Sequence, residues 1–112
     1  MAGSPERLLA ERRIRGRPVP FVYIVRCADG TFYTGYAVDV KARVAVHNAG
    51  QGAKYTAGRR PVRVVHVEET RQVGCALRRE YAIKQMARLE KRALVATSRA
   101  RTSRSPSRRA WT

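Results

Sequence analysis

Residues 21–36 read FVYIVRCADGTFYTGY, and this stretch decides how the sheet of the protein begins. Two runs rich in β-branched and aromatic residues flank the polar segment CADGT, a pattern typical of a β-hairpin. Hairpin turns of three residues favour glycine in the third position, where the backbone is left-handed, and Gly30 stands there. The stretch therefore predicts two antiparallel strands joined by a turn over residues 28–30.

The length of this turn decides whether two tyrosines share a face of the sheet, because side chains alternate between faces along a strand. A two-residue turn would place Tyr23 and Tyr33 on opposite faces. The three-residue turn pairs Val25 with Tyr33 and Tyr23 with Gly35, so both phenols point the same way and the glycine leaves room beside Tyr23. Two interpretations stay open, namely ordinary aromatic packing across strands or two phenols aimed at one point.

Beyond the hairpin, the sequence predicts one domain between two basic ends. Residues 1–18 are interrupted by proline and glycine and are interpreted as a flexible basic arm, with a helical turn around residues 7–13. Residues 98–112 are rich in Arg and Ser and are expected to form a disordered tail, because they hold too little apolar surface to order themselves. The domain itself spans residues 19–97.

The rest of the domain divides into segments with recognisable patterns. Asp39 is the expected N-cap of the first helix, and the last helical segment is expected to break near residues 86–89. The segments are a helix over 40–48, a Gly- and Arg-rich loop over 49–61, a strand over 62–69 and helices over 72–96. Their order predicts an α/β (α+β) fold, β-β-α-β-α-α, with a small three-stranded sheet flanked by helices.

The charge of the chain indicates a polyanionic partner. The formal net charge is +16, of which the first 18 residues supply about +3 and the last 14 about +5, so about +8 belongs to residues 19–98. Nucleic acid is the expected partner, because neutralising phosphates releases condensed counterions.

The sequence shows no transmembrane run and no secretory signal, so a cytoplasmic protein that does not bind membranes is expected. We expect a monomer and leave an oligomer open. Cys27 and Cys75 lack a metal-binding spacing and are expected to be reduced thiols.

Arg43 and His47 are candidates for phosphate chemistry on the first helix. They are four positions apart and so lie one turn above the other, beside an apolar stripe that includes Val40 and Val44. The planar guanidinium of Arg43 is suited to clamping a phosphate with two parallel hydrogen bonds. The alternative is an arginine that covers apolar surface with its stem and a buried histidine with its hydrogen bonds satisfied.

Glu80 is the most informative residue of the later helices. On a helical wheel it falls inside an apolar stripe, where a carboxylate is unfavourable unless it is paired or binds a metal. The stripe consists of Val73, Ala76, Leu77, Ile83 and Ala87. An ion pair with Lys84 and a metal site both stay open at this point. A single carboxylate completed by water and phosphate suits Mg²⁺.

The segment AKYTAGRRP, residues 53–61, interleaves basic residues with an aromatic one, a composition that suits contact with a nucleic-acid backbone. A solvated basic loop is the alternative. The candidate nucleic-acid contacts in this segment are Lys54, Tyr55, Thr56, Arg59 and Arg60.

Together these blocks resemble the GIY-YIG nuclease superfamily, and above all its small single-domain bacterial members. The blocks are VYIVRCADGTFYTG, VHNAGQGAKYTAGRRPV and ALRREYAIK, in this order within about residues 20–95. Phe21 and Val22 stand in place of the Gly-Ile of the first half-motif, and Tyr36 replaces a lysine found in some relatives. The asparagine that many relatives place after the metal-binding glutamate is missing.

The resemblance implies a metal-dependent endonuclease that hydrolyses phosphodiester bonds in DNA with one Mg²⁺ or Mn²⁺ ion. The implied catalytic residues are Tyr23, Tyr33, Arg43, His47 and Glu80, with Glu80 as the metal ligand. Gly35 is the motif glycine and a further candidate contact to nucleic acid. Because a phenol has an ordinary pKa of about 10, the hypothesis needs a cation such as Arg43 or the metal to lower it. The alternative is a binding module that kept the fold without turnover.

Overall fold

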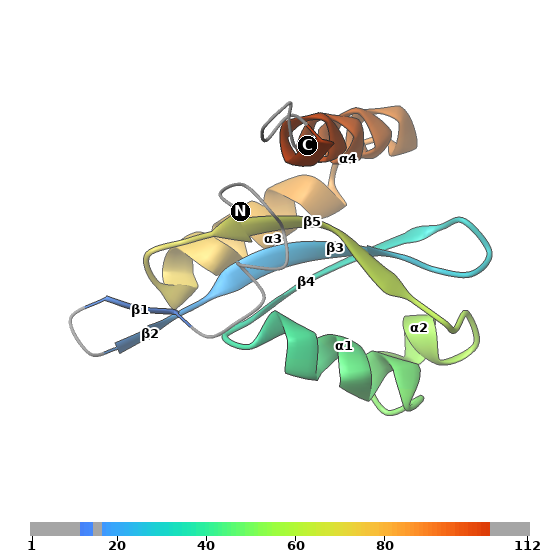
Figure 1. The fold of residues 1–112 in the computed structure, drawn as a ribbon, viewed down its shortest axis with the longest axis horizontal. Coiled ribbons are helices and arrows are strands. Elements are labelled where there is room, and N and C mark those ends of the chain that lie inside the picture. The colour runs from blue at the N-terminus through green and yellow to red at the C-terminus, as the bar shows by residue number, and fades with distance from the viewer. Residues whose placement is uncertain (1–11, 15–16, 104–112) are drawn as a thin grey trace.

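The computed structural model describes residues 12–14 and 17–103. The elements follow the predicted order, with a strand pair added at the start and a short helix added in the middle (Figure 1). They are β1 Arg12–Ile14, β2 Arg17–Val19, β3 Phe21–Arg26, β4 Phe32–Ala37, α1 Val40–Asn48, α2 Lys54–Ala57, β5 Arg63–Glu69, α3 Val73–Lys84 and α4 Arg88–Ser103. The predicted α+β architecture with its three-stranded sheet is confirmed.

The turn between β3 and β4 has the three-residue form predicted from the sequence. Val25 pairs with Tyr33, and Tyr23 pairs with Gly35. Gly30 has a φ of 87°, in the left-handed region that glycine enters without steric cost. Both tyrosines therefore leave the sheet on the same face.

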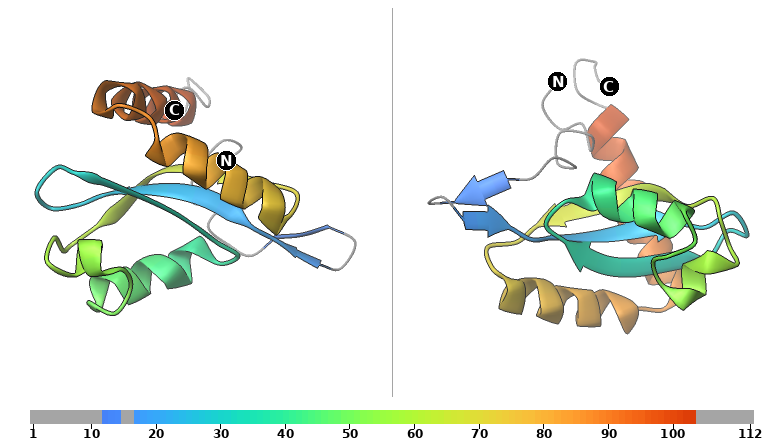
Figure 2. Two further views of the ribbon diagram at one scale, coloured as in Figure 1. Left: turned by 180° about the vertical axis from the view of Figure 1, so that it is seen from behind. Right: turned by 90° about the horizontal axis from the view of Figure 1, so that it is seen from below.

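Strand β3 lies in the middle of the sheet, whose order is β4-β3-β5 with antiparallel neighbours. Helices α1 and α2 lie on one face of this sheet, and α3 and α4 lie on the other (Figures 1 and 2). Because both faces of β3 are covered, its first five residues are all buried, and the strand is continuously apolar rather than alternating.

Each face of the sheet has its own hydrophobic cluster. The cluster on the α1 face contains Val19, Phe21, Tyr23, Val25, Cys27, Ala37, Val40 and Val62. The cluster on the α3 face contains Val22, Ile24, Ala76, Ile83 and Val95. Alternate residues of β3 thus serve the two layers, and this alternation directs Tyr23 toward α1.

Both ends of the chain differ in part from the prediction. Strands β1 and β2 pair antiparallel, so residues 12–14 are extended rather than part of a helical turn. The rest of the predicted arm, residues 1–11 and 15–16, lies outside the described residues. Helix α4 continues through residues 98–103, which were expected to belong to a disordered tail, and the alanine and arginines of this segment suit a helix. Residues 104–112 lie outside the described part.

The predicted Gly- and Arg-rich loop contains one more element, the short helix α2, which follows its N-cap Ala53 and ends at the C-cap Gly58. The expected break in the last helical segment is present, because α3 ends at Lys84 and α4 begins at Arg88. Cys27 is buried, Cys75 is half-buried, and both thiols are free. No helix in the described part of the chain has the length and apolar character needed to cross a membrane.

Candidate active site

An open pocket of about 350 Å³ lies between the sheet edge at β4, helix α1 and helix α3. The structure brings all five implied catalytic residues to this pocket, although they come from four elements. They are Tyr23 from β3, Tyr33 from β4, Arg43 and His47 from α1, and Glu80 from α3. Gly35 also lines the pocket. Of the two interpretations of the tyrosine pair, the geometry therefore favours phenols that face one point.

His47 is buried beneath the pocket and uses both ring nitrogens. Its Nε2 lies 2.9 Å from the hydroxyl of Tyr23, and its Nδ1 lies 2.9 Å from the hydroxyl of Thr56. The ring also meets Tyr33 edge-on, with 5.3 Å between the ring centroids. Burial lowers the pKa of His47, and the positive charge of Arg43 lowers it further. His47 is therefore held neutral and in a fixed orientation.

Tyr23 is only 1% exposed. Burial raises its pKa to about 12, and the nearby Tyr33 adds to the rise, whereas Arg43 acts in the opposite direction. The hypothesis that Arg43 lowers the pKa of a phenol here does not hold for Tyr23, because burial outweighs the charge of Arg43. Tyr23 consequently keeps its proton at neutral pH.

Gly35 allows this placement of Tyr23. A Cβ atom on Gly35 would lie 2.6 Å from the hydroxyl oxygen of Tyr23 and 2.8 Å from Cζ. Only a residue without a side chain lets the phenol cross the strand here. The glycine therefore shapes the pocket wall rather than offering a side chain to a partner.

Arg43 extends from α1 toward the sheet edge and remains exposed. Its guanidinium donates one long hydrogen bond, of 3.5 Å, to the carbonyl of Tyr36. The guanidinium also acts on the Tyr23 phenol, and its exposed part has further N–H donors for an anion in the pocket. This geometry is better suited to binding a phosphate than to covering apolar surface.

Glu80 lies at the edge of the pocket rather than in the core. The wheel position was misjudged, because Val73 and Leu77 are 48% and 46% exposed and do not belong to the buried stripe, which holds Ala76 and Ile83. The Glu80 side chain is 17% exposed, and its Oε2 lies 3.3 Å from Nζ of Lys84. The ion pair considered from the sequence is therefore present, and the carboxylate also faces the pocket.

The carboxylate of Glu80 fits a hard divalent cation. No group of three or more His, Cys, Asp or Glu side chains suited to a metal occurs among residues 12–14 and 17–103. A site built on one carboxylate suits Mg²⁺, which keeps several waters and binds through one or two carboxylates and substrate phosphates. The Lys84 ammonium competes for Oε2, but its side chain is 46% exposed and can turn toward solvent.

The residues of the 53–61 segment take different roles. Lys54 and Arg60 are exposed, and Arg60 donates to the carbonyl of Ala57 at 2.8 Å. The ring of Tyr55 stacks on that of Tyr33, with 5.9 Å between centroids. Thr56 was predicted as a nucleic-acid contact, but it is fully buried and bonds His47. A residue enclosed in this way supports the site from inside.

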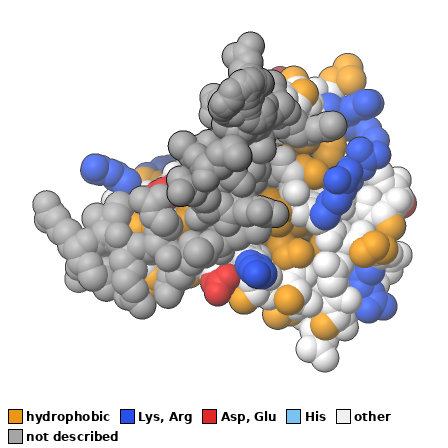
Figure 3. Space-filling model, viewed as in Figure 1, with side chains coloured by type: hydrophobic (Ala, Val, Ile, Leu, Met, Phe, Trp, Pro, Cys, Tyr) orange, Lys and Arg blue, Asp and Glu red, His pale blue; other side chains and the backbone are white. Residues whose placement is uncertain are grey.

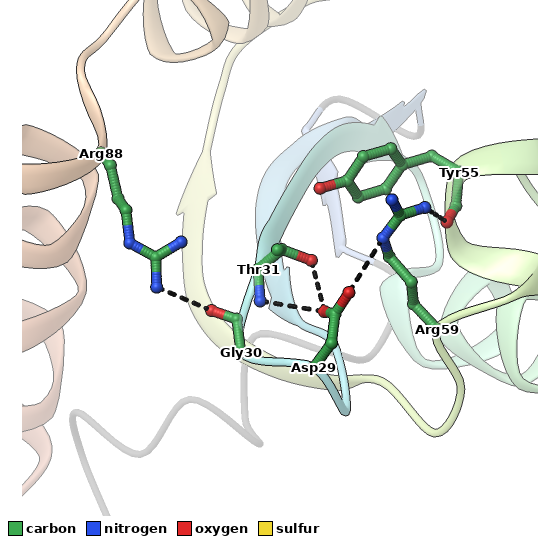
Figure 4. A network of polar contacts seen from close by, with 6 residues as sticks. All are labelled: Asp29, Gly30, Thr31, Tyr55, Arg59 and Arg88. Carbon is green, nitrogen blue, oxygen red and sulfur yellow. Dashed lines mark hydrogen bonds and ion pairs between the residues drawn. The ribbon is translucent and has the colours of Figure 1, made fainter.

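A polar network ties the hairpin turn to the 53–61 segment (Figure 4). Arg59 donates to Asp29 at 3.0 Å and to the carbonyl of Tyr55 at 2.8 Å, and its guanidinium lies 4.0 Å from the centre of the Tyr55 ring. Thr31 donates to the same carboxylate, and this bond lowers the pKa of Asp29. Sequence reasoning missed this network, and the only signal in the sequence was Asp29, in the middle of the turn.

Comparison with known proteins gives consistent matches over the domain. The sequence profile of the GIY-YIG catalytic domain matches residues 19–93. A UPF0213 protein of Halobacterium salinarum is 58% identical over 73 residues, which make up 65% of this chain and 95% of that protein. A UPF0213 protein of Staphylococcus aureus is 57% identical over 75 residues, or 67% of this chain and 92% of that protein.

Two solution NMR structures are similar as well. A UPF0213 protein from Bacillus halodurans is 38% identical with a TM-score of 0.50, and the match covers 79% of this chain and 97% of that chain. A protein from E. faecalis is 35% identical with a TM-score of 0.53, and the match covers 80% of this chain and 92% of that chain. The matched relatives are thus about as long as the domain.

Proposed function

The chain belongs to the GIY-YIG family, and from this membership and the pocket geometry we propose that it is a metal-dependent endonuclease that hydrolyses phosphodiester bonds in DNA. The observation that carries the proposal is the convergence of two phenols, an imidazole, a guanidinium and a carboxylate around one open pocket. Each of these groups has a use in phosphodiester hydrolysis.

Glu80, whose Oε2 is paired with Lys84, would hold one Mg²⁺ or Mn²⁺ ion. When bound, the ion would polarise the scissile phosphate and offset the negative charge on the leaving oxygen. Arg43 would stabilise the charge that develops on the phosphate, and by analogy with other preorganised donors its removal should lower the rate by about 10²–10³-fold.

The two tyrosines and His47 would act on the attacking water and on the phosphate. One phenol orients or deprotonates the attacking water, and the other holds the phosphate by a hydrogen bond. His47 is bonded to Tyr23, so it fixes the orientation of that phenol. The stack of Tyr55 on Tyr33 limits the motion of the second phenol.

A binding module without turnover is the second candidate function. This candidate is supported by the lack of the asparagine that many relatives place after the metal-binding glutamate. The only asparagine in the chain is Asn48, which bonds the backbone of Val62 and does not line the pocket. The ion pair of Glu80 with Lys84 gives the carboxylate a partner without a metal. This candidate predicts DNA binding that is indifferent to divalent ions and to Glu80→Ala.

The decisive experiment is nicking of supercoiled plasmid DNA by the purified full-length protein with Mg²⁺ or Mn²⁺. Glu80→Ala and Arg43→Ala should lose nicking, whereas Arg78→Ala on the exposed side of α3 and Lys41→Ala on the exposed side of α1 should retain it. Equal nicking by all five proteins would show a contaminating nuclease and remove the proposal. Absence of nicking together with metal-independent binding would favour the binding module.

A further inference from the structure

His47 is held from both sides inside the protein. Its Nε2 lies 2.9 Å from the Tyr23 hydroxyl, and its Nδ1 lies 2.9 Å from Oγ1 of Thr56. The backbone N–H of Ala53 also points at Nδ1, at 3.4 Å. Tyr23, His47 and Thr56 are each 2% exposed or less, so water does not replace these bonds.

The direction of these hydrogen bonds follows from the one group whose polarity is fixed. A backbone N–H can only donate, so Nδ1 of His47 accepts from Ala53 and carries no proton. The Thr56 hydroxyl can rotate between Nδ1 and the Ala53 carbonyl, 3.0 Å away. Because Nδ1 carries no proton and lies 2.9 Å from Oγ1, two lone pairs would face each other if the hydroxyl pointed only at the carbonyl, so the hydroxyl donates to Nδ1. The imidazole proton then lies on Nε2 and is donated to the oxygen of Tyr23.

We propose that Thr56 is a positioning residue which, by donating to Nδ1 of His47, keeps the imidazole proton on Nε2 and leaves the hydroxyl proton of Tyr23 to point into the pocket, toward an anionic oxygen of the substrate. The inference rests on the proposed function for the identity of that oxygen as a phosphate oxygen. It gives the two phenols different tasks: Tyr23 donates to the phosphate, and Tyr33 remains for the attacking water.

The environment of the two bonded groups supports this assignment. Burial raises the pKa of Tyr23 to about 12, so the phenol keeps the proton that it donates. Burial and then the charge of Arg43 lower the pKa of His47, so the imidazole stays neutral and has a single proton to place. A doubly protonated ring would direct Nδ1–H against the N–H of Ala53.

The tautomer of His47 can be measured without any substrate. Long-range ¹H–¹⁵N NMR distinguishes a protonated Nε2 from a protonated Nδ1, and the chain has only two histidines, so a His66→Gln spectrum identifies the His47 signals. We expect the Nε2–H pattern in the wild type and in Thr56→Ser, and loss of that single pattern in Thr56→Val, because the Ala53 contact at 3.4 Å is too long to hold the tautomer without the 2.9 Å bond from Thr56. A protonated Nδ1 in the wild type, or an unchanged pattern in Thr56→Val, would overturn the proposal. This result stands even if the protein cleaves nothing.

Cleavage kinetics provide the second readout. Thr56→Val should lower the cleavage rate by about tenfold, roughly the effect of one neutral hydrogen bond, and Thr56→Ser should restore it. In a Tyr23→Phe background Thr56→Val should cause no further loss, because the hydroxyl through which it acts is gone. Losses that multiply would assign Thr56 a role in stability alone and refute the proposal. If melting curves show that Thr56→Val does not fold, the wild-type and Thr56→Ser tautomers decide the question.

Discussion

Gly35 is the single residue whose substitution should disturb the pocket most directly. The Tyr23 phenol crosses it, and an added Cβ would meet the hydroxyl oxygen at 2.6 Å. Tyr23 is buried and bonded to His47, so it cannot swing aside without losing that bond. We expect Gly35→Ala to lower plasmid nicking more than tenfold and to lower the free energy of unfolding by about 1–3 kcal/mol, the usual effect of overpacking.

Gly58→Ala is the matched control for this prediction, since a Cβ there meets no atom within 4 Å. Its φ of −92° is compatible with alanine. Urea unfolding and plasmid nicking of both variants provide the measurement. Wild-type nicking by Gly35→Ala would contradict the placement of Tyr23 described above.

Some residue-scale features could be predicted, and others could not. The register of the tyrosines followed from Gly30, because one turn type requires glycine at that position. The inner role of Thr56 could not be predicted, because it depends on a short helix whose four residues show no periodicity. A threonine between a tyrosine and an alanine gives no sign in the sequence of whether it lies in a solvent-exposed loop or bonds a buried histidine.

At the scale of elements, a half-buried ion pair joins β5 to α3. Glu68 accepts from Arg79 at 2.7 and 2.9 Å and lies 2.7 Å from Nε2 of His66. Burial opposes ionisation of Glu68, but the bonds from His66 and Arg79 outweigh it and lower the pKa from 4.5 to about 2. The network therefore stabilises the contact between the sheet and α3 when Glu68 is charged.

The pH dependence of stability should report this network. A carboxylate whose folded pKa lies below its unfolded value contributes stability above the unfolded pKa and loses it as pH falls through the folded one. The contribution, about 3 kcal/mol at most, should be complete above pH 4.5 and fade toward pH 2. Melting temperatures of the wild type and Glu68→Gln should therefore converge in this window. Parallel curves between pH 7 and 2.5 would contradict the assignment.

The predictions of helices and strands were correct where a single local feature of the sequence was sufficient. The cap at Asp39, which accepts from the N–H of Ala42 at 3.0 Å, marks the start of α1 as expected. The face of α3 was misjudged, because a helical wheel places apolar residues together without showing which of them meet the sheet. Val73 and Leu77 share a side of α3 that points to solvent, so Glu80 lies at a boundary rather than in the interior.

At the scale of the whole molecule, the excess of positive charge is the dominant property, and part of this charge is concentrated on one side of the surface. Figure 3 shows Lys and Arg side chains gathered along one side of the protein. Arg26 and Arg63 face each other across β3 and β5, and both are exposed. Arg88 reaches the nearby Gly30 carbonyl at 3.4 Å (Figure 4). Like charges directly opposite in a sheet are destabilising, so this arrangement is costly to the fold alone and favourable next to a polyanion.

The salt dependence of DNA binding by the full-length protein therefore provides the last prediction. Each phosphate contact contributes about 0.9 to the slope of log K against log salt, so Arg26→Gln with Arg63→Gln should lower that slope by about 1–2. The same double variant should melt no lower than the wild type, because it relieves a like-charge pair. Arg71→Gln, just before α3, with Arg78→Gln, in the middle of α3, removes the same charge and should change the slope less. Equal slopes for the two double variants would show that total charge alone, and not this pair, governs the encounter with DNA.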